Sequence, residues 1–453
     1  MDLESDRPRH VVAIVGGATA GSAAAQILAD SGVIVLVVEQ NERPYGKIED
    51  GLPRWHLQQR RNEYEKIDAR LQRPGVHYLP RTRLGRDVDF DTLTRDWGLS
   101  AILLANGAWK DRPLPVESAT SFLGRGLVYQ NSLIYWFNHK GEQAYAGQRY
   151  FVPDGTLVVG GGLASIDVIK VVQFEIYERA LRARGIEVSM HDLEHKGIGE
   201  ICSQHGVEAA ALGVKNGILV YRRRGEDMPL AQIPPGAGPE KIAKTQEVRA
   251  RILHKAQEKY LFEFRPNLAP VAPLIEGDQL VGLRFLRTQV ENGTVKSIPG
   301  SEVEIRSELT ISSIGSVPEP IPGIDMKGEY YVFKDEATGQ YAGRSNVFGA
   351  GNVVTGKGNI RVSLEHGQAV AHALVEQYLG VAEREPGAPT QLLQDARGSQ
   401  MGQELLARLS QQPPLPGPKV AEILERVRTL QQKIGYDTDY ATWIRRVTPP
   451  DLE

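Results

Sequence analysis

The chain has 453 residues but only one cysteine, Cys202, and this scarcity excludes several kinds of redox centre. A disulfide framework and a Cys-x-x-Cys pair each need two thiols, and an iron–sulfur cluster needs several thiolates. If the protein moves electrons, they therefore leave from an organic cofactor. We interpret Cys202 as a packed thiol without a chemical role.

Long apolar runs and an excess of one charge are missing too. No stretch approaches the ~18 apolar residues that a membrane-spanning helix needs. The 53 basic and 56 acidic residues give a net charge of −3, which offers no polycation for nucleic acid. The polar, partly acidic segment Met1–His10 is unlike a secretory or transit peptide. We expect a cytoplasmic protein with neither membrane nor nucleic acid as a partner. No His, Cys and Asp spacing suggests a metal site.

Two strand–glycine-turn–helix units are present instead. The apolar segment His10–Val15 runs into the turn Gly16–Gly21, and Thr156–Val159 runs into Gly160–Ser165; a helical pattern follows each turn. An apolar strand before the glycines and a helix after them is the context that a dinucleotide fingerprint requires. Two such turns predict two bound nucleotides. The economical reason to hold two is to pass a hydride from one to the other.

The first turn suits FAD or NAD. In such units the pyrophosphate lies on the helix N-terminus, where free N–H groups and the helix dipole attract negative charge. Gly16 and Gly21 occupy the first and third glycine positions, whereas Ala18 replaces the middle one beside the pliable Gly17. Glu39 follows about 20 residues later at the end of the next strand, where a carboxylate binds ribose hydroxyls and disfavours a 2′-phosphate. The alternative is a decayed turn with a surface glutamate.

The second turn suits NADPH. Gly160 and Gly162 are in place, and Ser165 is a small residue at the third position. The next strand ends in Arg222–Arg224, and guanidinium groups there pair with the 2′-phosphate of NADPH through charge-assisted hydrogen bonds. The alternative is a solvated basic strand end, and NADH stays possible as the donor.

Several linked motifs resemble a known family. The flavin domain of the adrenodoxin reductase family is similar to the segments Gly16–Glu39, Arg43–Gly46, Gly85–Val88 and Leu103–Ala108. The glutamate synthase small-subunit group shares this architecture, and its NADPH-binding strand end resembles Tyr221–Arg223 followed by Met228–Pro229. Tyr129–His139 is similar to the segment that precedes the NADPH domain in the first family. Gly349–Ile360 matches the second flavin signature of both. The resemblance covers about residues 10 to 375 in order.

The resemblance implies an α/β fold with two Rossmann-like nucleotide-binding domains of the three-layer ββα type. The NADPH domain is then inserted into a discontinuous FAD domain. We expect the FAD domain to join residues 1–115 and 330–395, with the NAD(P)H domain at 116–329. Residues 396–453 are expected to form a helical C-terminal appendage.

The same resemblance implies roles for single residues. Tyr45 and Gly46 would lie along the flavin, Gly351 and Asn352 would meet its ribityl–phosphate portion, and Asn359 and Ile360 would reach its pyrimidine edge. Gly162, Leu163 and Ala164 would approach the NADPH pyrophosphate. The predicted cofactor-binding set is Gly16, Gly17, Ala18, Ala20, Gly21, Glu39, Gln40, Tyr45, Gly46, Ala105, Asn106, Gly107, Gly162, Leu163, Ala164, Arg222, Arg223, Gly351, Asn352, Asn359 and Ile360. Ala18, Asn106 and Asn352 depart from the residues usual in the family.

The candidate catalytic residue is His56, in a polar loop beside Trp55. An imidazole titrates near neutral pH and could exchange a proton with reduced flavin; the alternative is an ordinary polar contact.

We expect NADPH to reduce bound FAD by hydride transfer, with electrons passing to a ferredoxin-like iron–sulfur protein or a partner enzyme subunit. Two alternatives stay open. One is an FAD-binding scaffold that has lost turnover, and the other is a flavoenzyme acting on a bound organic substrate, shaped by residues 185–215 and the C-terminal segment.

Overall fold

The computed structural model describes residues 8–143, 145–234, 236–291, 293–381 and 412–450, and it divides into two compact units. Unit 1 combines the residues up to Glu49 with Leu57–Lys110 and those from Ser316 onward; unit 2 combines Asp50–His56 with Asp111–Gly315. The short strands β5 (Lys110–Asp111) and β14 (Ser316–Val317) lie where the chain crosses between the units. The domain boundaries expected from the sequence stay predictions, and their portions at 382–395 and 396–411 lie outside the described residues.

A seven-stranded sheet forms the centre of unit 1, in the order β17–β18–β19–β4–β1–β2–β3. Strands β1 to β4 and β19 run parallel, with Val11 opposite Ile34 in the central pair. The strands are β1 (Val11–Val15), β2 (Ile34–Val38), β3 (Val76–Leu79), β4 (Ala101–Leu104), β17 (Phe333–Asp335), β18 (Gln340–Tyr341) and β19 (Val347–Gly349), with the separate pair β15 (Met326–Lys327) and β16 (Tyr330–Tyr331). Strands β1, β2 and β4 are buried along their whole length, which explains their unbroken apolar runs.

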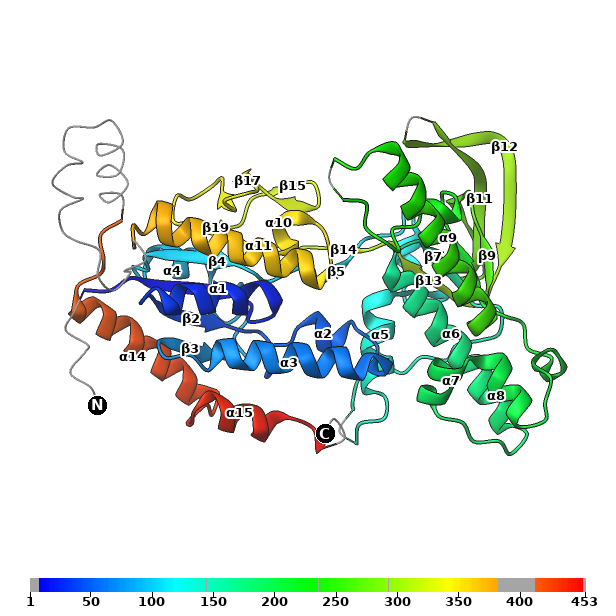
Figure 1. Ribbon diagram of the computed structural model, residues 1–453, viewed down its shortest axis with the longest axis horizontal. Coiled ribbons are helices and arrows are strands. Elements are labelled where there is room, and N and C mark those ends of the chain that lie inside the picture. Colours follow the sequence, from blue (N-terminus) through cyan, green and yellow to red (C-terminus); the bar gives the residue numbers. More distant parts are fainter. Residues whose placement is uncertain (1–7, 144, 235, 292, 382–411, 451–453) are drawn as a thin grey trace. The chain divides into compact units, whose positions relative to one another are not determined.

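Small residues let two helices of unit 1 pack closely on this sheet. Helix α1 (Thr19–Asp30) lies alongside α11 (Ile360–Ala373) in Figure 1. A Cβ added at Gly367 of α11 would meet the backbone oxygen of Ala20 at 2.6 Å, so the two backbones nearly touch. Among the described residues, the other helices of this unit are α3 (Leu57–Leu71), α4 (Phe90–Arg95), α10 (Asn352–Thr355), the π-helical turn Leu374–Tyr378, α14 (Gly417–Lys433) and α15 (Tyr440–Val447), while α2 (Lys47–Asp50) ends across the unit boundary.

The C-terminal helices α14 and α15 pack beside the β3 edge of unit 1 (Figure 1). The Trp443 indole is buried and donates a hydrogen bond of 2.8 Å to the backbone oxygen of Glu42. The Tyr440 hydroxyl donates to the Asp68 carboxylate of α3 at 2.7 Å. These contacts tie the C-terminal segment to the loop that follows Glu39 and to helix α3.

We predict that Tyr440→Phe destabilises the protein by about 1.5 kcal/mol, since it removes a partly buried hydrogen bond to a carboxylate. Denaturant unfolding of the full chain measures the change. Tyr436→Phe is the matched control, because the described residues give the Tyr436 hydroxyl no hydrogen-bond partner. Equal effects of the two substitutions would contradict a specific role of the Tyr440 hydroxyl.

Unit 2 has a five-stranded parallel sheet in the order β6–β13–β7–β8–β9 and a separate antiparallel sheet β10–β11–β12. The strands are β6 (Leu127–Tyr129), β7 (Leu157–Gly160), β8 (Ile218–Val220), β9 (Glu263–Arg265), β10 (Leu268–Glu276), β11 (Gln279–Glu291), β12 (Thr294–Arg306) and β13 (Thr310–Ser313). The helices are α5 (Gln130–His139), α6 (Leu163–Arg182), α7 (Met190–Lys196), α8 (Ile198–Gln204) and α9 (Pro239–Tyr260), and short 3₁₀ turns cover Arg54–His56, Ala119–Phe122, Ala209–Leu212 and Gly225–Asp227. Each unit thus has its own sheet of wholly or mainly parallel strands with a glycine turn after one of them, which confirms the predicted α/β class with two Rossmann-like domains.

Candidate functional site

The first glycine turn is so closely packed that its glycines are structurally required. Gly16 has a φ of +99°, and a Cβ there would meet the Ala105 backbone oxygen at 2.6 Å. A Cβ at Gly21 would lie 1.8 Å from the backbone oxygen of Gly16. Gly21 therefore lets helix α1 pack against the strand end, as expected of the third glycine of a dinucleotide turn.

Glu39 lies against this turn, at the end of β2. Its side chain is buried, and its Oε2 accepts a hydrogen bond of 2.8 Å from the Gly17 N–H. Its Oε1 accepts one of 3.0 Å from the N–H of Asn41. Gln40, the residue between Glu39 and Asn41, is half-buried. The carboxylate is thus held at the place where a dinucleotide fold presents it to a ribose, and it also fixes the turn.

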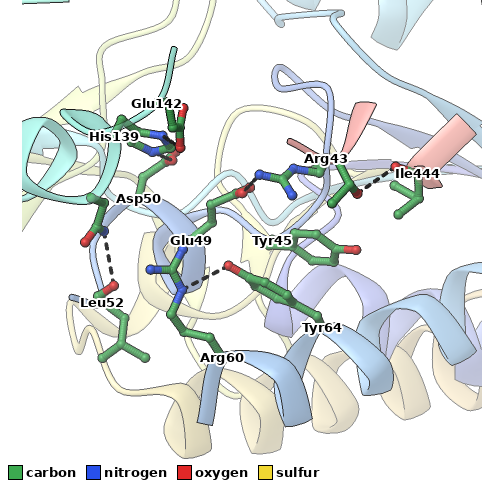
Figure 2. A network of polar contacts seen from close by, with 12 residues as sticks. Arg43, Tyr45, Glu49, Asp50, Leu52, Arg60, Tyr64, His139, Glu142 and Ile444 are labelled. Carbon is green, nitrogen blue, oxygen red and sulfur yellow. Dashed lines mark hydrogen bonds and ion pairs between the residues drawn. The ribbon is translucent and has the colours of Figure 1, made fainter. Parts of the chain in front are cut away.

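The segment after Glu39 closes over the same turn. A Cβ at Gly46 would lie 3.1 Å from the Ala18 methyl group, so the residue that replaces the middle glycine packs against Gly46. Tyr45 itself is buried and stacks on Tyr64 with ring centroids 3.9 Å apart (Figure 2). Its hydroxyl donates to the Asp68 carboxylate at 3.1 Å. Burial first, then Asp68, raises the pKa of Tyr45. In unit 1 the ring of Tyr45 therefore packs on helix α3.

The segment that resembles a second flavin signature packs against helix α1. Gly351 has a φ of +73°, and a Cβ there would lie 2.7 Å from the Ala20 Cβ. The Gly351 N–H donates to His366 Nδ1 at 2.9 Å, while His366 Nε2 lies 2.8 Å from the backbone oxygen of Glu336. An imidazole that accepts at Nδ1 carries its proton on Nε2, so both contacts are satisfied by the neutral ring.

Two buried amide oxygens near the carboxyl ends of β4 and β19 have no hydrogen-bond partner among the described residues. They are Oδ1 of Asn106 and Oδ1 of Asn352. The Asn106 amide nitrogen donates to the Tyr331 hydroxyl at 3.2 Å, and Gly107 follows with a φ of +67° and open space at its Cα. Because buried polar atoms are nearly always hydrogen-bonded, these oxygens are free to accept from a bound polar group. They fit the hydroxyl-rich ribityl chain of FAD.

The end of the second signature begins helix α11. Asn359 caps this helix, and its Oδ1 accepts from the N–H groups of Arg361 and Val362 at 2.9 and 3.3 Å. Ile360 is the first helical residue. The cap orients the helix N-terminus, whose free N–H groups favour an electron-rich ligand edge.

The second glycine turn lies between β7 and α6 in unit 2. Ser165 replaces the third glycine, and its hydroxyl donates to the Ser313 backbone oxygen of β13 at 2.9 Å. A Cβ at Gly161 would meet the Tyr221 ring at 2.1 Å, whereas one at Gly162 would meet nothing within 4 Å. Leu163 and Ala164, the first helical residues, are exposed. The turn thus packs against the Tyr221 ring at Gly161, whereas the N-terminus of helix α6 is open to solvent.

The three arginines after β8 differ in their contacts. The Arg224 guanidinium forms a bidentate ion pair with the Asp227 carboxylate, with both N···O distances 3.0 Å. Arg223 donates to the Gly293 backbone oxygen at 2.8 Å. Arg222 is exposed, and none of the described residues forms an ion pair with its guanidinium. Arg222 is therefore the most available of the three for a phosphate.

Residues 50–56 leave unit 1 and are fastened into unit 2 by helix α5. The buried Asn138 accepts from the Arg54 N–H and donates to the Leu52 backbone oxygen, both at 3.1 Å. His139 lies between two carboxylates, with Nε2 3.3 Å from Asp50 and Nδ1 2.7 Å from Glu142 (Figure 2). This clamp fixes the 3₁₀ turn that carries the candidate catalytic histidine.

His56, the last residue of this turn, pairs with Asp167 of α6. Its Nε2 lies 3.3 Å from Asp167 Oδ1, and both side chains stay partly exposed. Asp167 also helps to line a small hollow with Ala164, Gln130 and Gly51. Sequence reasoning missed Asp167, because an acid two residues after Ser165 carries no signal of its own until the loop is placed beside the helix.

Within the residues that the structure describes, no group of three or more His, Cys, Asp and Glu side chains could hold a metal ion. No helix in these same ranges is both long and apolar enough to cross a bilayer.

Comparison with known proteins finds relatives of the kind that the sequence motifs predict. No family model matches the chain. The NADPH glutamate synthase small chain of Halomonas elongata is 22% identical over 389 residues, which cover 82% of this chain and 68% of that relative. The putative oxidoreductase AegA of Escherichia coli is 23% identical over 392 residues, covering 82% of this chain and 49% of AegA. The chain thus matches only about half of AegA, and only 38% of the glutamate synthase small chain of Mycobacterium tuberculosis.

Among solved structures, FprA from Mycobacterium tuberculosis in complex with NADPH has a TM-score of 0.63 at 17% identity. The match covers 93% of this chain and all of that one. The predicted resemblance is therefore confirmed: the chain is similar in sequence to glutamate synthase small chains and shares the fold of FprA.

Proposed function

We propose that this protein is a flavoprotein oxidoreductase in which NADPH reduces bound FAD by hydride transfer. The observation that carries the proposal is that the strand beside the first glycine turn is followed by an acidic residue and the strand beside the second by a basic one. Glu39 is fixed against the first turn by the Gly17 N–H at 2.8 Å, and the exposed Arg222 follows the strand beside the second. A carboxylate favours ribose hydroxyls and a guanidinium favours a 2′-phosphate, so each turn selects a different nucleotide.

The residues of unit 1 would hold FAD by backbone and amide groups. The α1 N-terminus would receive the pyrophosphate, Glu39 the ribose, and the free oxygens of Asn106 and Asn352 the ribityl hydroxyls. Asn352 departs from the residue usual in the family, yet its amide oxygen can accept these hydrogen bonds. When bound, FAD supplies hydride acceptance and onward electron transfer.

The residues of unit 2 would hold NADPH and handle a proton. The open N-terminus of α6 at Gly162 and Leu163 would receive the pyrophosphate, and Arg222 with Arg223 the 2′-phosphate. Asp167 orients the His56 imidazole at 3.3 Å, as expected for a group that takes up and returns a proton.

The direct test is anaerobic reduction of the purified protein. We expect a flavin absorbance band that bleaches on addition of NADPH faster than with NADH. Free FAD without protein is the control for non-enzymatic reduction. If the protein holds a flavin that neither NADPH nor NADH bleaches, the reductase proposal is wrong and the FAD-binding scaffold takes its place.

We further propose that the reduced protein passes electrons to a protein partner, either a ferredoxin-like iron–sulfur protein or a larger enzyme subunit. The likeness to chains named as small chains of glutamate synthase supports the second kind of partner. Reoxidation only on addition of ferredoxin favours the first. Reoxidation by a small organic compound alone would favour the substrate-converting flavoenzyme.

A further inference from the structure

A buried lysine lies behind the His56–Asp167 pair. Lys170 is one turn after Asp167 on α6, and only 5% of its surface is exposed. Its Nζ lies 4.4 Å from the centre of the Trp55 ring and 4.8 Å from that of Tyr260. A lysine is rarely buried so fully unless it is paired, so its partners decide what it does.

Those partners are two carboxylates on different helices. Lys170 Nζ is 3.2 Å from Glu194 Oε1 of α7 and 3.9 Å from Asp167 Oδ1. The Tyr260 hydroxyl of α9 also donates to Glu194 at 3.2 Å. Segment 185–215 thus supplies, through α7, the Glu194 carboxylate that holds this lysine in place.

His56 and Lys170 approach the same oxygen of Asp167. The imidazole Nε2 is 3.3 Å and the ammonium 3.9 Å from Oδ1, so the two nitrogens lie within about 7 Å of each other. A carboxylate next to an imidazole favours its protonated form, whereas a nearby ammonium opposes it. We propose that Lys170 is a positioning residue that shares the Asp167 carboxylate with His56 and limits how firmly this carboxylate holds a proton on the imidazole.

The surroundings of Lys170 are consistent with a charged ammonium. Burial first lowers the pKa of Lys170, and Lys259 of α9 adds to this, while Asp167 and Glu194 oppose it. Burial also opposes ionisation of Glu194, yet Lys170, Lys259 and Tyr260 together lower the pKa of Glu194. The other face is covered by Trp55, whose ring stabilises a cation without competing for its protons.

The inference rests on the proposed function only in taking His56 as the proton-handling group, and its test needs neither cofactor nor turnover. We propose NMR titration of the full-length protein with isotope-labelled histidine, assigning the His56 signal with His56→Gln. Lys170→Met removes the charge and keeps the apolar stem over Trp55. We expect the titration midpoint of His56 to rise by at least about half a pH unit, the shift that unit charges about 7 Å apart produce even in bulk water.

Lys140→Met is the matched control. The Lys140 ammonium also lies over aromatic rings, 4.8 Å from Trp136 and 5.2 Å from Phe137, and pairs with Glu175. Because the Lys140 ammonium pairs with Glu175 and not with Asp167, this substitution should move the His56 midpoint less than Lys170→Met does, whereas Lys170→Arg should keep it near the wild-type value.

An unchanged or lowered His56 midpoint in Lys170→Met would overturn the proposal; Lys170→Gln replaces this variant if it does not fold. A purely structural role of Lys170 would alter unfolding stability without moving the midpoint. If the midpoint rises but NADPH never bleaches a bound flavin, the charge sharing stands and the reductase function falls.

Discussion

Gly21→Ala is expected to destabilise unit 1 by more than about 3 kcal/mol and to abolish FAD retention. The added Cβ would lie 1.8 Å from the backbone oxygen of Gly16 and 3.2 Å from the Ile14 side chain. A backbone oxygen cannot move away as a flexible side chain can, so helix α1 must shift from the strand end. Denaturant unfolding and the flavin-to-protein absorbance ratio measure the two effects.

Gly199→Ala is the matched control for Gly21→Ala. Gly199 also lies near the start of a helix, α8, but a Cβ there would meet nothing within 4 Å. The same substitution should therefore leave stability unchanged or raise it by up to about 1 kcal/mol through helix propensity. Similar unfolding midpoints for the two variants would show that the close approach at Gly21 can relax.

Replacing Arg222 and Arg223 together by alanine is expected to reduce the preference for NADPH over NADH by about two orders of magnitude. Each hydrogen bond between a guanidinium and a phosphate is worth about 1.5–3 kcal/mol, and NADH lacks the 2′-phosphate that would receive it. The preference is measured as the ratio of kcat/KM for flavin reduction by the two nucleotides. Reduction by NADH itself should change little.

Arg224→Ala is the control for this pair. Its guanidinium is already held by Asp227 at 3.0 Å and by Glu226 at 3.2 Å, so we expect the preference to stay within about threefold of wild type. A preference that survives the double substitution would remove Arg222 and Arg223 from the proposed NADPH site.

The sequence was sufficient to predict the features that depend on neighbouring residues. Apolar strands that end in glycines marked both turns, and the spacing of Glu39 from Gly16 placed a carboxylate that the structure finds against Gly17. The hydrogen bonds that Glu39 makes to backbone N–H groups were not predictable, because main-chain geometry leaves no pattern in side-chain type. Close packing of Ala18 on Gly46 likewise explains the missing middle glycine only once the loop is in place.

The contacts of unit 2 around His56 join segments that are 84 to 111 residues apart in the sequence. Neither the Asn138 clamp on Leu52 and Arg54 nor the pairing of His56 with Asp167 has a local signal. The sequence pattern of helix α6 does not show whether Lys170 lies on the surface or in the core. The structure shows that it is buried, with its ammonium beside the Trp55 ring and two carboxylates.

The interleaving of the two units has a consequence for the chain as it leaves the ribosome. Strand β4 of unit 1 must wait for β19, about 240 residues later, before its second edge is paired. Unit 2 meanwhile holds all its pieces once Gly315 has emerged, since residues 50–56 are already made. At typical synthesis rates of roughly 5–20 residues per second, the N-terminal strands wait roughly 10 to 50 s with an open apolar edge. The nascent protein is therefore most prone to aggregate in that interval, and a chaperone that covers β4 would act before the first nucleotide site exists.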